Sequence, residues 1–595
     1  MAVADVTLDA LKRKLDEVQR FLHISLSIAN AHTVDFYTHD VWSQFMAVTP
    51  EDVLTCFGST NDLKMAPEVK EKATFGFCNE SKKLVDVSAL VKAAKDRSLP
   101  GLGVCLSRTD LLKYLRAAGG ERQVEKGETP DDIIVPDEFM NCKKAHEVQA
   151  MSEVVSSLAK HCEVKQVIDV GSGKGYLCTY LSMQYLLQVF GIDSSATNTH
   201  GAQERNRKLR KFSRAYQRHG RAIEAGCPTV SQPQDSREKE VESRHSEGGE
   251  RRDIEEKKNE RMIQKDGVLE ECHLLNKPDE DSCDSVNPDG ENPFLSALSL
   301  DVVETPSPRV PPSELSMEER ERRKRENLER KAQNAKANGS NNGITFSPLT
   351  SYITAETELQ EIVPELEDAV LVGLHTCGDL AASTLRMFVA KRELNALCSV
   401  GCCYHLLSEE FEPTRQECEN GIYGFPVSQY LRGQACFCGR NARMSACLAL
   451  ERVTVGGGLP MESLFYRAVL HVILQDHYDA HKSERRVGNV YSKASSFVDY
   501  VRRALRKLQL DDSKLSDSII QGYHDQYKPR MNEMVAFNML KVTLAPCIEG
   551  LILLDRLCYL KEQENVRVSA LVQLFDPLRS PRCYAVVGVK TSGKT

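Results

Sequence analysis

The sequence predicts an α/β fold with a parallel sheet, and two stretches support this prediction. In VIDVGSGKGYLCTYL, residues 167–181, an apolar run ends in a glycine loop and a helix-like run follows. Residues 368–407 read as strand, helix and strand: DAVLVGLHTCGDL, AASTLRMFVAKREL and NALCSVGCCYHLL. This alternation is typical of parallel strands joined by crossover helices.

Composition limits the class of protein. At 595 residues the chain exceeds one ordinary domain, and 41% hydrophobic residues can form a sizeable core. The net charge of −8 gives no global sign of nucleic-acid binding. The 20 cysteines are scattered, and no secretory signal or run of about 20 apolar residues is visible. We therefore expect an intracellular protein, cytoplasmic or nuclear or both, with reduced cysteines, no membrane span and an unspecified oligomeric state.

Composition and periodicity also divide the chain into segments. Leucine spacing at the start indicates helices, and residues 220–342 are rich in Glu, Lys, Arg, Ser, Asn and Pro, which predicts disorder. The last apolar runs flank Asp-Pro and Ser-Pro turns, which indicates a β-hairpin. The predicted segments are a helical N-terminal region (1–130), the first part of the α/β domain (131–219), a disordered insertion (220–342), the second part of the α/β domain (343–411), a helical insertion (412–564) and a closing hairpin (565–590).

The spacing of the glycine loop excludes a P-loop and disfavours a dinucleotide-binding site. A P-loop requires G-x-x-x-x-G-K-[ST]. The first of those positions is Ile168, and Gly175 rather than Ser or Thr follows Lys174. The dinucleotide fingerprint G-x-G-x-x-G is also broken, because its third glycine comes one residue early and Tyr176 takes its place. A dinucleotide such as NAD is therefore disfavoured, although not excluded.

Two aspartates suggest a different ligand. Asp169 ends the first strand, where a carboxylate suits an ammonium group better than a pyrophosphate, and S-adenosylmethionine (SAM) carries such a group. Asp193 follows the next apolar run, 24 residues later, where a carboxylate can accept hydrogen bonds from ribose hydroxyls. That role fits SAM and NAD alike. The predicted cofactor-binding residues are Asp169, Gly171, Gly173, Gly175 and Asp193.

Five motifs in order resemble a known family. IDVGSGKGYL, the later Asp193 and the final hairpin are similar to the class I SAM-dependent methyltransferases. Together with CKKAHEV, GLHTCGDL, GCCYHLL and GRNARM, they resemble the methyltransferase-like protein 25 family. The resemblance covers residues 136–590 and implies a Rossmann-like class I methyltransferase sheet with a C-terminal antiparallel hairpin. It implies SAM as cofactor. It also implies that CKKAHEV lies near the SAM pocket, so that Lys143, Lys144, His146 and Glu147 contact cofactor or substrate, with a capped helix start as the alternative.

Polar residues at two further strand ends are the catalytic candidates. Ligands of such sheets bind beyond the carboxyl ends of the strands. Methyl transfer requires alignment of the acceptor and, for some acceptors, removal of a proton. The bases at these ends are His375, Asp379 and His405. The pairs Cys402-Cys403 and Cys436-x-Cys438 lack the C-x-x-C spacing of zinc sites, so no metal is predicted.

We therefore expect a SAM-dependent methyltransferase that modifies an N, O or C acceptor, with RNA or protein as partner. A basic helix-like run from Arg205 to Arg218 could contact phosphates. The alternative is an inactive SAM-fold interaction module, for which the insertions would provide binding surfaces.

Overall fold

The centre of the fold is a mixed sheet, which has eight strands among the residues that the structure describes. Strands β4 to β8 run parallel to one another, and β10 runs antiparallel to both its neighbours. The order is β3 (Cys105–Ser107), β9 (Val566–Gln573), β10 (Tyr584–Lys590), β8 (Leu394–Gly401), β7 (Ala369–Thr376), β4 (Gln166–Val170), β5 (Gln188–Asp193) and β6 (Phe346–Thr350). The chain order reverses between β4 and β7, which is where α/β sheets open a binding crevice.

The computed structural model describes residues 6–58, 73–118, 140–207, 346–413, 421–448, 461–478 and 487–591. All of these belong to one compact unit. The predicted insertion 220–342 and the predicted basic run from Lys208 onward lie outside the described residues.

Alternate residues of the strands face two apolar layers. Ile168, Phe190 and Leu371 join the first layer, while Val167, Val189 and Val370 join the second. Because side chains alternate along a strand, apolar residues at every position bury both faces of a central strand. The helices of the second layer are α6 (Arg108–Ala118), α7 (Cys142–His161) and α8 (Tyr176–Tyr185). Those of the first layer nearest the sheet are α13 (Leu380–Ala390) and α20 (Met531–Lys561).

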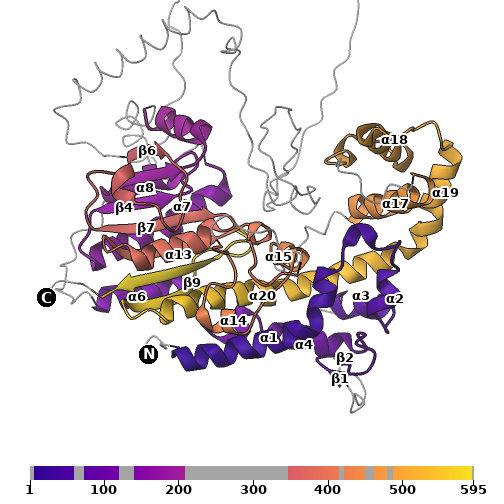
Figure 1. Cartoon of the computed structure of the whole chain (residues 1–595), viewed down its shortest axis with the longest axis horizontal. Helices are drawn as coiled ribbons and strands as arrows, with labels where there is room; N and C mark the ends of the chain where they lie inside the picture. The colour runs from indigo at the N-terminus through magenta and orange to yellow at the C-terminus, as the bar shows by residue number, and fades with distance from the viewer. Residues whose placement is uncertain are drawn as a thin grey trace, which may run out of the picture. The chain divides into compact units, whose positions relative to one another are not determined.

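The remaining helices extend the first layer around α20. Helix α1 (Leu8–Asn30) packs along α20 (Figure 1). The N-terminal part further contains α2 (Val41–Phe45), α3 (Pro50–Gly58), α4 (Val87–Asp96), α5 (Leu99–Leu102) and the small sheet β1 (Ala73–Thr74) with β2 (Phe77–Cys78). The later part contains α12 (Leu359–Ile362), α14 (Gln429–Gly433), α15 (Arg440–Ser445), α17 (Met461–Tyr478), α18 (Phe497–Leu508) and α19 (Asp517–Tyr527).

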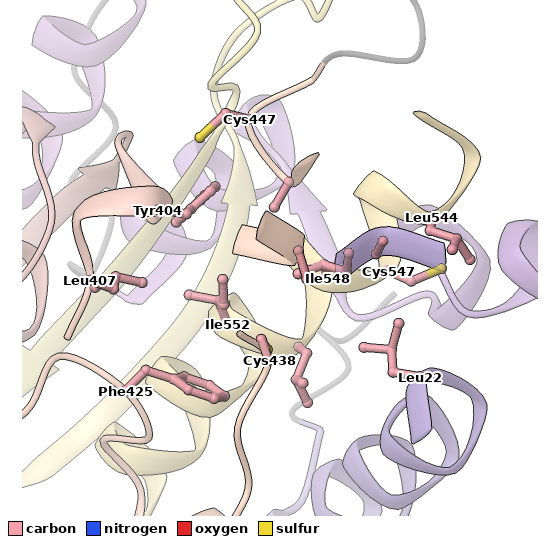
Figure 2. Close-up of a cluster of buried hydrophobic side chains, with 14 of the residues drawn as sticks. Leu22, Tyr404, Leu407, Phe425, Cys438, Cys447, Leu544, Cys547, Ile548 and Ile552 are labelled. Atoms are coloured by element: carbon pink, nitrogen blue, oxygen red, sulfur yellow. The ribbon is translucent and has the colours of Figure 1, made fainter. Parts of the chain in front are cut away.

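Helix α20 is the main support of the first layer. Within the described residues, one helical stretch, Asp517–Lys561, is long and apolar enough to cross a membrane, but 89% of its apolar window is buried inside the protein. That burial is typical of a core helix. Figure 2 shows how residues of α20 meet side chains from α1 and from the loops after β8; the labelled members are Leu22, Tyr404, Leu407, Phe425, Cys438, Cys447, Leu544, Cys547, Ile548 and Ile552.

The sheet extends one strand further than the sequence predicted. The hairpin of β9 and β10 was expected to close the sheet, and β10 does pair with β8. However, β3 pairs in parallel with β9 and forms the edge. The N-terminal region is therefore not only helical, and it contributes a strand to the sheet. A strand of three residues carries too little periodicity to be predicted.

Candidate functional site

The glycine loop joins β4 to α8 and leaves open space above its centre. Gly171, Gly173 and Gly175 all have positive φ angles, of 69°, 54° and 71°. A Cβ on Gly175 would lie 2.6 Å from the ring of Phe346, so that position packs against the fold. A Cβ on Gly173 would meet no heavy atom within 4 Å. The structure therefore offers room for a ligand at Gly173, bordered by backbone N–H groups.

Asp193 holds this loop in place. The backbone N–H of Gly173 donates to its Oδ2 over 2.9 Å. Its Oδ1 accepts from the backbone N–H of Ser195 (2.9 Å) and from the side-chain amide of Asn198 (3.1 Å). The carboxylate thus lies beside the open space, at the end of the strand next to β4. A carboxylate oxygen has two lone pairs, so these bonds leave one lone pair of Oδ2 for a ribose hydroxyl.

Asp169 lies buried beneath the loop with one oxygen unpaired. The Cys178 thiol donates to its Oδ2 over 3.0 Å, whereas its Oδ1 has no hydrogen-bond partner. Burial raises the pKa of this carboxyl to about 7. The buried hydroxyl of Ser172 is also without a partner. Unsatisfied buried polar atoms under an open loop are unusual, and an ammonium group would satisfy the carboxylate. These residues fit the ammonium group of SAM.

His375 forms a hydrogen bond with Glu147 at the end of β7. Its Nε2 lies 3.1 Å from Oε2 of Glu147, and 29% of the His375 side chain remains exposed. Glu147 is fully buried, and the hydroxyl of Ser580 donates to its other oxygen over 2.8 Å. Lys143 and Lys144 lie 3.9 and 3.7 Å from its oxygens.

The charge of Glu147 is stabilised in spite of its burial. Burial alone would raise its pKa, but the hydrogen bond from His375 and the charges of His375, Lys144 and Lys143 lower the pKa to about 2. Glu147 is therefore anionic at neutral pH and fixes the orientation of the His375 ring. Such a carboxylate–histidine pair is the arrangement of an oriented general base.

The other two predicted bases lie in different surroundings. The carboxylate of Asp379 accepts from the backbone N–H of Ser408 (2.8 Å) and from its hydroxyl (2.7 Å). It thereby anchors the loop after β8. His405 is half-buried, with its Nδ1 3.8 Å from the thiol of Cys447, and burial lowers its pKa. The structure therefore does not bring the three candidates together as one set.

The side chains of the CKKAHEV motif contact two different parts of the site region. Lys143, Lys144 and Glu147 belong to the cluster at His375, as described above. His146 instead accepts at Nε2 from the backbone N–H of Asp576, over 3.0 Å. It thus binds the turn of the C-terminal hairpin, and Ser580 of that turn reaches Glu147. Sequence reasoning missed Ser580, because no local signal marks a contact that spans 433 residues.

The cysteines at the ends of β7 and β8 do not form a site with Cys436 and Cys438, the pair considered with them in the sequence. Cys377, Cys402 and Cys403 form one cluster. Hydrogen bonds from the thiols of Cys402 and Cys403 lower the pKa of Cys377 to about 4. Cys436 and Cys438 lie instead in the apolar core, as Figure 2 shows for Cys438.

Only the start of the predicted basic helix is described. The guanidinium of Arg205 lies 3.7 Å from the ring centre of Tyr176, and Arg207 pairs with Glu204 over 2.9 Å. Arg205 thus packs on α8, whereas 71% of the Arg207 side chain is exposed. The remaining basic residues, up to Arg218, lie outside the described residues, so the role of this helix in partner binding stays a prediction.

Comparisons with known proteins agree with this geometry. A family model described as a methyltransferase domain matches residues 143–281 and 307–410. Two relatives, from Mus musculus and Homo sapiens, bear the name "Probable methyltransferase-like protein 25". The mouse protein is 47% identical over 605 residues, which are 98% of this chain and 97% of that protein. The human protein is 47% identical over 616 residues, 98% of each chain. No solved structure matches significantly. The match to the domain confirms the predicted α/β fold class.

Proposed function

The chain belongs to the methyltransferase-like protein 25 family, and on that premise we propose that it transfers a methyl group from SAM to an N, O or C acceptor on RNA or protein. The observation that carries the proposal is the glycine loop. It is open above Gly173 and has an unpaired carboxylate oxygen of Asp169 beneath it and Asp193 beside it. The ammonium group and the ribose diol of SAM are hydrogen-bond donors, which suit these two carboxylates and the open space beside them.

Each residue of the loop has a distinct task in this proposal. SAM supplies an electrophilic methyl group on its sulfonium. The free oxygen of Asp169 accepts from the ammonium group, and Oδ2 of Asp193 accepts from a ribose hydroxyl. Gly173 contributes only its backbone, since any side chain would occupy the space above the loop.

His375 and Glu147 act on the acceptor. His375 lies at the end of β7, the strand next to β4, where an acceptor would approach the loop, and Glu147 of α7 contacts it there. Glu147 holds one ring nitrogen of His375, which leaves the other free to take the proton that an N or O acceptor loses. The positive charge that forms on the imidazole is then stabilised by the buried carboxylate.

A two-stage experiment tests the proposal. Isothermal titration calorimetry of the purified full chain should show SAM binding in the micromolar range or tighter and no comparable heat with NADH. Methyl-labelled SAM is then incubated with the protein and separate RNA and protein fractions of cells that lack it. Label should enter one fraction and depend on His375. NADH binding without SAM binding would refute the proposal, and SAM binding with label in neither fraction would favour the interaction module.

A further inference from the structure

Three thiols converge at the ends of β7 and β8. The Sγ atoms of Cys377 and Cys402 lie 2.9 Å apart, and those of Cys402 and Cys403 lie 3.6 Å apart. All three sulfur atoms lie within 4.8 Å of one another. Among the described residues, this is the one group of His, Cys, Asp and Glu ligand atoms with metal-binding proximity.

The backbone that carries these thiols is well fixed. The N–H of Cys402 donates to the carbonyl oxygen of Thr376 over 3.3 Å. The Thr376 hydroxyl donates in turn to the carbonyl oxygen of Val400 over 3.0 Å. After Cys377, Gly378 has a φ of 54°, and a Cβ there would lie 2.8 Å from the carbonyl oxygen of Leu406. The two loops are thus held side by side by adjacent strands, which is how a rigid site is built.

The convergence of three sulfurs suits a metal ion better than a disulfide. Three sulfurs that each lie about 2.3 Å from a tetrahedral zinc ion are about 3.8 Å from one another. The cluster comes within about 1 Å of that spacing for the two pairs measured, with distances of 2.9 and 3.6 Å. A disulfide would use only two of the thiols and would leave the third beside it without a role.

Two buried cations lie next to the cluster, and one of them suits thiolates. The guanidinium of Arg556 packs against Gly401, the residue before Cys402, so closely that a Cβ there would lie 2.2 Å from its Nη1. Arg556 and Arg582 are both buried, and their guanidiniums lie 5.7 and 5.4 Å from the ring centre of Tyr404. The Nε of Arg556 has no hydrogen-bond partner. Arg582 also pairs with Glu549 over 3.3 Å, so Arg556 is the cation whose charge offsets the negative charge of a metal site with three thiolates.

We propose that Cys377, Cys402 and Cys403 bind one zinc ion as thiolates, with a fourth position occupied by water or by an atom of a bound molecule. When the ion binds, each thiol that is still protonated releases its proton to solvent. Three Zn–S bonds form, and no atom changes its oxidation state. The ion joins the loops after β7 and β8. The proposal does not depend on SAM binding or on methyl transfer.

The test uses the full chain. The protein is purified under reducing conditions, stripped with a chelator and titrated with Zn²⁺, with Zn²⁺ measured by mass spectrometry of the metal after dialysis. One zinc ion per chain is expected. Titration with Co²⁺ should then give the intense near-ultraviolet sulfur-to-cobalt band and the visible bands of a tetrahedral ion, and Zn²⁺ should abolish both.

Variants decide where the ion binds. Cys377→Ser should weaken Zn²⁺ binding by more than about 100-fold, since even outer partners of metal ligands typically contribute 10–100-fold. Cys377 is exposed, so this variant should fold, which circular dichroism checks. Cys142→Ser, at another exposed cysteine, is the matched control and should keep the zinc ion.

Three results would overturn the proposal. The first is stripped wild-type protein that gives no sulfur-to-cobalt band. The second is a Cys377→Ser variant that binds Zn²⁺ as tightly as Cys142→Ser does. The third is a wild-type protein that takes up no Zn²⁺ and instead forms a Cys377–Cys402 disulfide under mild oxidation, identified by peptide mapping.

Discussion

The Nε2 of His375 lies 3.1 Å from Oε2 of Glu147, although 228 residues separate the two along the chain. Glu147 belongs to α7, and His375 lies near the end of β7. The carboxylate is fully buried, whereas the imidazole is partly exposed at the edge where the strands end. This pair distinguishes His375 from the other predicted bases, because the buried carboxylate orients the ring.

Replacement of His375 with alanine should affect turnover and not cofactor binding. We expect SAM affinity within a few-fold of wild type, and a fall in kcat by roughly 10²–10⁴, the usual effect of losing an acid–base group. Calorimetry and the labelled-methyl assay measure the two quantities separately.

The matched variants of that experiment are Glu147→Gln and His405→Ala. Glu147→Gln should lower kcat less than His375→Ala and shift its pH profile, because the imidazole remains but loses its anionic partner. Equal loss of SAM binding and turnover in His375→Ala would place His375 in the cofactor pocket. Full activity of His375→Ala, with loss in His405→Ala, would move the chemistry to His405.

The open space at Gly173 gives a second prediction. Gly173→Arg should abolish SAM binding, because its side chain would fill the space above the loop. Gly103→Arg is a matched control: Gly103 also has a positive φ, of 62°, and open space at its Cβ, but it ends α5. Both variants carry a similar backbone strain. If Gly103→Arg also loses SAM binding in calorimetry, global destabilisation and not the loop explains the result.

Burial of Asp169 gives a prediction on pH. Its pKa is raised from 3.8 to about 7, so between these values the folded protein holds a proton that the unfolded chain has lost. Stability therefore falls as the pH rises through this window, by roughly 4 kcal/mol at most. In Asp169→Asn that penalty disappears, so at pH 8 the ligand-free variant should melt at a higher temperature than wild type.

The same residue should make SAM binding depend on pH. An ammonium group pairs with the ionised carboxyl, so SAM affinity of the wild type should rise between pH 5.5 and 7, by up to about tenfold per pH unit. In Asp169→Asn the affinity should be weaker and nearly independent of pH over that range. A wild-type affinity that stays constant in this calorimetric series would contradict the assignment of Asp169 to the ammonium group.

Asp379 should prove structural. Asp379→Ala removes the acceptor of two hydrogen bonds from Ser408, which should lower the free energy of unfolding by about 3 kcal/mol. Urea unfolding measures this loss. The kcat of Asp379→Ala, calculated per folded molecule, should fall far less than the kcat of His375→Ala. A variant as stable as wild type but as inactive as His375→Ala would instead make Asp379 the base.

Local patterns in the sequence were sufficient to predict the central strands of the sheet and the glycine loop. The apolar runs that became β4, β5, β7 and β8 are continuous because both faces of these strands are buried. The glycines at 171, 173 and 175 take positive φ angles in a turn within one short segment. Such features depend on neighbours along the chain, so spacing alone reveals them.

Tertiary structure alone decided which of the polar residues meet. Glu147 contacts His375 and Ser580, and Cys377 contacts Cys402. These contacts form because α7, two strand ends and the hairpin turn pack against one another. The edge strand β3 likewise exists only through its pairing with β9. The sequence by itself determined strands β4, β5, β7 and β8, the glycine loop and the aspartates that flank it. Contacts between residues that lie 25 to 433 positions apart depend on how whole elements pack, and no local spacing encodes them.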